Sequence, residues 1–84
     1  MKLPRDLAGI ELAHALSQFG YKITRQSGSH LRLTYAGPPE HHVTIPAHKT
    51  LKLGTLAAIL ADVASRHALS RAELLDRLFD HSHQ

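Results

Sequence analysis

Residues 25–34 read RQSGSHLRLT, and this stretch decides the fold. Its Ser-Gly-Ser centre predicts a tight turn, because glycine adopts positive φ without steric cost. From His30 onward polar and apolar residues alternate, which is typical of a half-buried strand. Leu31 and Leu33 are therefore predicted to face the core, and His30 and Arg32 to stand together on the open face. A titratable imidazole beside a permanent cation suits phosphodiester chemistry.

Two further strands are predicted around this one. Residues 21–26 are rich in β-formers, with Tyr21 and Ile23 facing inward, and residues 41–45 alternate in the same way. The segment 36–40 holds two prolines and is predicted to be a loop. The three strands form an antiparallel meander. Its open face is expected to carry polar residues from all three strands: Lys22, Thr24, His30, Arg32, Thr34, His42 and Thr44.

Three helices are predicted from apolar spacing and capping residues. The first spans residues 4–19, with Asp6 complementing its amino-terminal dipole. The second begins near Thr55 as its cap and ends near residue 67. The third begins at Ser70, which forms an S-x-x-E capping box with Glu73. The expected core positions are Ala8, Leu12, Ala15, Leu16 and Phe19, then Leu56, Ile59, Leu60 and Val63, then Ala72, Leu75, Leu78 and Phe79. An α+β domain results, with the helices on one side of the sheet.

The length and composition of the chain limit the classes of protein to which it can belong. The chain has 84 residues, which predicts one domain, and a hydrophobic content of 43% excludes wholesale disorder. Cysteine is absent, so disulfides and thiolate chemistry are excluded, in keeping with a reducing compartment. No apolar run is long enough to span a membrane, and the start lacks the apolar region of a secretory signal. We therefore expect a cytoplasmic protein with no membrane partner.

The positive charge is concentrated in the middle of the chain. The formal net charge is +3, and residues 22–52 hold five cations against one acid, Glu40. A basic segment of this kind indicates a polyanionic partner. The candidate RNA-binding residues lie in or beside it: Lys22, Arg25, Ser29, Arg32, His48, Lys49 and Lys52.

His30 is the candidate catalytic residue. RNA cleavage needs a base that takes the proton of the 2′-hydroxyl and cations that stabilise charge on phosphorus. His30 would be the base, and Arg32 or Arg25 the cation. The alternative is an exposed histidine without a task, because no Asp or Glu lies nearby in the sequence to orient the ring.

His48 is the second histidine considered. The simpler interpretation is a loop histidine that hydrogen-bonds the backbone and orders the turn. The functional one makes it an auxiliary acid or phosphate donor, near a helix start at residues 54–55 that Lys49 and Lys52 flank.

The eight histidines do not predict a metal site. His41 and His42 are adjacent in a strand and face opposite sides, and His81 and His83 lie in the tail. We expect neither a metal nor another cofactor.

Three blocks resemble the HicA family of toxins, also called YcfA-like: Gly28-Ser29-His30, then VTIPAH at residues 43–48, then LGTLxxIL at residues 53–60. The resemblance runs from about residue 6 to residue 79. It implies a fold like a double-stranded-RNA-binding domain, with a helix, three strands and a helix over residues 6–67. An additional helix at about residues 70–80 completes a single domain over residues 1–84.

This resemblance also implies a function. The chain is similar to ribosome-independent mRNA interferases, metal-independent endoribonucleases that act as toxins of type II toxin–antitoxin pairs. The family's active-site histidine falls on His30, and a HicB-type antitoxin would cover it. The loop at residues 36–40 and the helix from Ser70 are less typical of the shortest members, so that helix is either an antitoxin contact or a lid on the core.

Two other functions stay open on the sequence alone. The same fold and basic face would serve an RNA-binding module without chemistry. They would also serve a structural subunit whose sheet face is covered by a protein partner.

Overall fold

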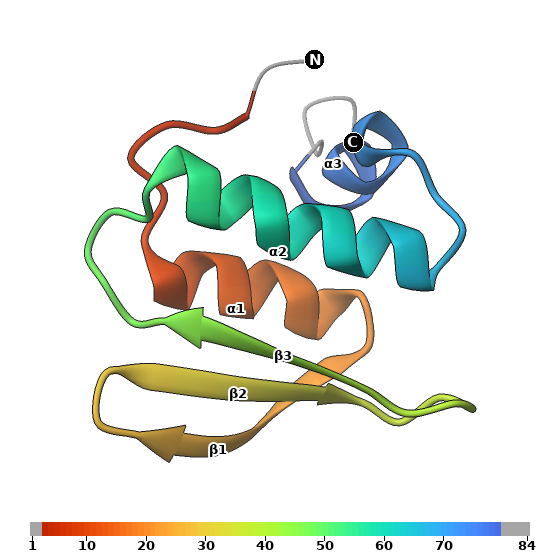
Figure 1. Cartoon of the computed structure of the whole chain (residues 1–84), viewed down its shortest axis with the longest axis horizontal. Coiled ribbons are helices and arrows are strands. Elements are labelled where there is room, and N and C mark those ends of the chain that lie inside the picture. Colours follow the sequence, from red (N-terminus) through yellow and green to blue (C-terminus); the bar gives the residue numbers. More distant parts are fainter. Residues whose placement is uncertain (1–2, 80–84) are drawn as a thin grey trace.

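The computed structural model describes residues 3–79 (Figure 1). Its elements run α1 (Gly9–Gln18), β1 (Tyr21–Ser27), β2 (His30–Tyr35), β3 (His41–Pro46), α2 (Leu53–Arg66) and α3 (Arg71–Phe79). The α+β class and the predicted order of elements are confirmed. The predicted helix end at residue 80, and His81 and His83, lie outside the described residues.

The strands form an antiparallel sheet in the order β1-β2-β3, and the helices lie on one side of it (Figure 1). Inward positions of β2 and β3 are buried, as the alternation predicted. These side chains and apolar side chains of α1, α2 and α3 form one hydrophobic core. From the strands it includes Leu31, Leu33, Val43 and Ile45, and from the helices Leu12, Leu16, Leu56, Leu60 and Leu74. In the described part of the chain no helix is long and apolar enough to cross a membrane.

The first helix begins later than predicted. It starts at Gly9 instead of residue 4, because Asp6 adopts a φ of 56° and breaks the helical path there. Asp6 is therefore not part of the first turn, and Ala8 is the N-cap instead of a core position. The Ala8 N–H donates to Glu11 Oε1 at 2.8 Å, so Glu11 satisfies one of the free amides at the helix start.

Other local predictions are also corrected. α2 starts two residues before Thr55, and the Lys52 carbonyl accepts the first helical bond, so Thr55 is not the cap. Ile23, which was predicted to face inward, is 45% exposed although it pairs with the buried Leu33. In α3 Leu74 is buried and Ala72 is exposed.

The capping box of α3 is confirmed. The Glu73 N–H donates to Ser70 Oγ at 3.1 Å, and the Ser70 N–H donates to Glu73 Oε1 at 2.8 Å. The bond from the Ser70 main-chain N–H, with a smaller contribution from the Ser70 side chain, holds the pKa of the Glu73 carboxyl below its usual value. The start of this helix was thus correctly predicted from a local four-residue pattern.

Gly9 allows α1 to approach the end of β3 at backbone distance. Its N–H donates to the His48 carbonyl at 2.9 Å. A Cβ at this position would overlap the Pro46 carbonyl oxygen and crowd the Ala47 backbone. The sequence indicated only that Gly9 weakens the helix, whereas the structure shows that no larger residue fits.

We predict that Gly9→Ala destabilises the protein by about 1–3 kcal/mol, the usual cost of forcing atoms into a packed site. Gly54→Ala is the matched control, because Gly54 is also helical and a Cβ there meets nothing within 4 Å. That control should gain about 0.5–1 kcal/mol. Urea unfolding of both variants measures this, and equal effects would contradict the close approach.

Candidate nucleic-acid interface

A two-residue turn places His30 at the start of β2. Ser27 pairs with His30 across the ladder, which leaves Gly28 and Ser29 as the loop. Gly28 has a φ of +58°, as glycine does at the first position of a type II′ hairpin turn. Leu31 is buried and His30 is exposed, so the imidazole lies on the open face, as predicted.

The segment after β3 is tied to this turn by main-chain bonds. The Ala47 N–H donates to the Ser29 carbonyl at 2.6 Å, and the Leu51 N–H donates to the Leu7 carbonyl at 2.7 Å. His48 contributes its carbonyl to Gly9, so its backbone and not its ring orders the loop. The His48 ring is exposed. The turn, the end of β3 and the starts of α1 and α2 thus meet at one end of the molecule (Figure 1).

A shift in register brings Arg25 onto the open face. Strict alternation would turn Arg25 toward the core side with Tyr21 and Ile23. The register shifts between Ile23 and Arg25, so that Arg25 lies directly opposite Arg32. Directly paired residues project their side chains on the same face. The irregularity therefore places two guanidinium-bearing positions side by side, next to His30 on β2.

The predicted binding residues are not all brought together. All are exposed: Lys22, Arg25, Ser29, Arg32, His48, Lys49 and Lys52. Ser29 adjoins His30 and is bonded by the Ala47 N–H, and Arg25 and Arg32 follow along the strands. Lys22 is opposite Thr34, four residues from His30 along β2, which is about 14 Å. Lys22 therefore belongs to the far end of the same face.

The cations of this face are free of ion pairs within residues 3–79. The two ion pairs found there join His41 to Asp62 at 3.4 Å and His42 to Glu40 at 3.1 Å. His30 is likewise without a carboxylate partner in the described chain. No group of three or more His, Asp or Glu residues that could hold a metal is found in this same range. The face is open to a polyanion.

A second cluster of titratable groups, around Tyr21, lies on the core side. The Tyr21 hydroxyl contacts His41 Nδ1 at 2.7 Å and His67 Nε2 at 3.0 Å. Burial, with a smaller contribution from Asp62, raises the pKa of Tyr21 to about 12. Burial lowers the pKa of His67, and Arg66 and His41 lower it further. Sequence reasoning placed Tyr21 inward but gave His67 no role beyond the end of a helix.

Hydrogen-bond directions explain why this cluster is structural. The Tyr21 hydroxyl carries one hydrogen, so it donates to one of the two histidine rings and accepts from the other. The His67 ring also packs edge-to-face against Phe19, at 5.0 Å between centroids. The cluster joins the sheet to the end of α2, at the opposite end of β2 from His30.

We predict that stability falls as pH drops below about 6.5, the ordinary pKa of histidine. The folded state lowers the pKa of His67, so the unfolded chain binds more protons and is favoured in acid. His67→Phe keeps an aromatic ring and removes the titration, so its unfolding free energy should fall less between pH 7 and pH 5. Denaturant midpoints at several pH values measure this, and equal slopes for both proteins would contradict it.

The fold and the candidate interface together define a small α+β domain with an open cationic sheet face. A family model described as HicA toxin of bacterial toxin–antitoxin matches residues 9–64, two-thirds of the chain. The chain belongs to the HicA toxin family, and the family predicted from the sequence is confirmed. The match ends within α2, so α3 lies outside it. No curated protein and no solved structure matches the chain.

Membership makes the protein a toxin of a bacterial toxin–antitoxin system, with an antitoxin as the implied partner.

Proposed function

We propose that this toxin is an mRNA interferase, an endoribonuclease in which His30 is the general base. The observation that carries the proposal is the position of His30, exposed at a hairpin turn on the face where Arg25 and Arg32 are paired. Family membership supports a toxic activity. Lysines and arginines on this face that make no ion pair within the described residues suit a polyanionic substrate.

The chemistry needs only groups that this end of the molecule offers. The His30 imidazole takes the proton of a ribose 2′-hydroxyl, and the 2′-oxygen attacks the adjacent phosphorus. The bond from phosphorus to the 5′-oxygen breaks, and a 2′,3′-cyclic phosphate forms. The departing 5′-oxygen takes a proton from the imidazolium or from His48. The Arg25 and Arg32 guanidinium groups stabilise the charge that develops on the phosphoryl oxygens.

The antitoxin in this proposal is of the HicB type and covers the His30 face. Its contact surface would be acidic, because the face carries Lys22, Arg25 and Arg32 against a single described acid, Glu40. Covering His30 would block substrate entry without any change in the toxin's fold.

We predict that His30→Ala lowers RNA cleavage by about 10²–10⁴-fold, the usual contribution of a general base, and abolishes growth arrest. The fold should survive, because His30 is exposed. His14→Ala is the matched control, since His14 is an exposed histidine on α1. Cleavage of labelled RNA by the purified proteins measures both effects. Equal activity of His30→Ala and wild type would contradict the proposed role.

A second candidate function is RNA binding without chemistry. The observation that favours it is the lack of a carboxylate partner for His30 within residues 3–79. In that case wild-type protein would retard the labelled RNA in a gel with salt-dependent affinity and leave it intact.

A further inference from the structure

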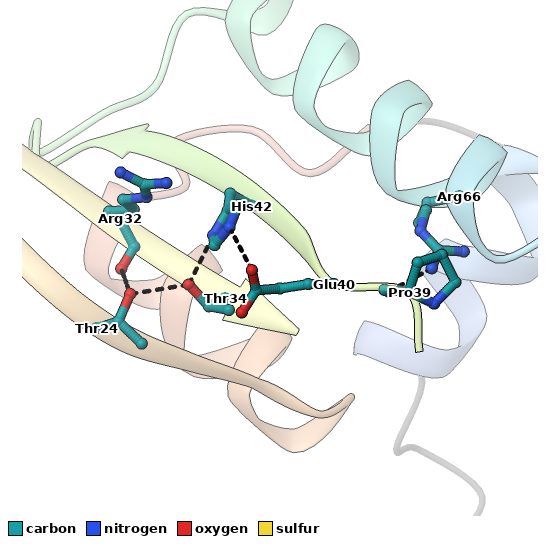
Figure 2. A network of polar contacts seen from close by, with 7 residues as sticks. All are labelled: Thr24, Arg32, Thr34, Pro39, Glu40, His42 and Arg66. Carbon is teal, nitrogen blue, oxygen red and sulfur yellow. Dashed lines mark hydrogen bonds and ion pairs between the residues drawn. The ribbon is translucent and has the colours of Figure 1, made fainter. Parts of the chain in front are cut away.

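A chain of polar contacts crosses the open face at the end farther from His30 (Figure 2). Glu40 Oε1 lies 3.1 Å from His42 Nε2, and His42 Nδ1 lies 2.8 Å from Thr34 Oγ1. Thr34 Oγ1 lies 2.9 Å from Thr24 Oγ1, which also reaches the Arg32 carbonyl at 3.4 Å. The contacts link all three strands, since the residues come from β1, β2 and β3 and the loop before β3.

The His42 ring is held at both of its nitrogens. The Glu40 carboxylate only accepts, so His42 Nε2 donates to it. In a neutral ring Nδ1 then accepts from the Thr34 hydroxyl. His42 therefore has no free nitrogen for acid–base work. Its side chain is still 39% exposed.

The segment that carries Glu40 is anchored as well. The Arg66 guanidinium of α2 donates to the Pro39 carbonyl, directly before Glu40 (Figure 2). The carboxylate that positions the ring thus follows a residue held by the helix layer. An aromatic ring fixed at both nitrogens presents its faces in a set orientation before any ligand arrives.

The position of His42 relates it to the proposed cleavage site. Thr34 pairs with His42, and His30 pairs with Pro46, so the two histidines lie on the same face about 14 Å apart along the strands. Arg32 and Thr44 are paired between them. An RNA strand that places a phosphate at His30 and runs along β2 and β3 would reach His42 with a nearby nucleotide.

We propose that His42, fixed by Glu40 and Thr34, is a stacking platform for one unpaired nucleobase of the RNA. This inference rests on the proposed function, and it names single-stranded RNA as the substrate form that the face accepts. Unpaired bases stack on histidine and other aromatic rings in RNA-binding proteins. A guanidinium from a protein partner also stacks on such rings, but Lys22, Arg25 and Arg32 on this face repel it and attract RNA.

Two substitutions separate the ring from its hydrogen bonds. His42→Phe keeps an aromatic ring and loses both bonds, whereas His42→Gln keeps polar atoms and loses the ring. The probe is a short unpaired 2′-O-methyl RNA, which lacks the 2′-hydroxyl needed for cleavage and carries 2-aminopurine at one position at a time. We expect His42→Gln to bind about 5- to 150-fold more weakly, the range for loss of one stacked base. His42→Phe keeps the stacking ring and loses only its fixation, so its affinity should lie between those of His42→Gln and wild type. One 2-aminopurine position should be quenched by wild type and by His42→Phe, but not by His42→Gln.

Three results would overturn the platform: wild-type affinity in His42→Gln, equal weakening in both variants, or no binding by wild type. A loss of antitoxin affinity alone in His42→Gln would assign the ring to the protein partner instead. Thermal melting of both variants checks their folding. Cleavage of ordinary RNA is measured separately, so that binding and quenching without cleavage defeat the proposed nuclease and leave the platform standing.

Discussion

The arrangement depends on a set of main-chain contacts at one end of the sheet. Gly9 donates to the His48 carbonyl and lies so close to Pro46 that only glycine fits. The next residue of that segment, Ala47, donates to the Ser29 carbonyl in the hairpin turn. The start of α1, the end of β3 and the turn are thereby fixed to each other through backbone atoms. His30, which directly follows Ser29, is positioned by this set of main-chain contacts.

The sheet divides the histidines into two kinds. His41 faces the helices and joins His67 around Tyr21, where burial and mutual contacts hold the packing together. His30 and His42 face solvent, one without a described carboxylate partner and the other held at both nitrogens. The alternation of side chains along the strands therefore separates the structural histidine of the sheet from the two candidate functional ones. The exposed pair suits two tasks, proton transfer at His30 and base stacking at His42.

Much of this fold was predictable because the deciding signals are local. Alternation in β2 and β3 correctly assigned Leu31, Leu33, Val43 and Ile45 to the core, and Ser70 with three further residues defined the start of α3. The placement of His30 on the open face follows from the same alternation. The assignment of His30 as catalytic stays a prediction.

Other features depend on contacts between distant segments, which periodicity does not encode. The clash that reserves Gly9 comes from Pro46, 37 residues away in the sequence. The register shift that places Arg25 on the open face appears only in the pairing of β1 with β2, where Arg25 lies opposite Arg32. The role of His67 appears only when α2 meets Tyr21. The start of α1 was misplaced because Asp6 was assigned to the first helical turn, whereas it adopts a positive φ.

In the proposed reaction an exposed imidazole at the hairpin turn activates a ribose hydroxyl. The chemistry of the RNA ends made by the purified wild-type protein tests this step. Attack by the 2′-oxygen leaves a 2′,3′-cyclic phosphate on one fragment and a 5′-hydroxyl on the other, and we expect these ends. Fragments with a 3′-hydroxyl and a 5′-phosphate would require attack by water on phosphorus and would contradict it.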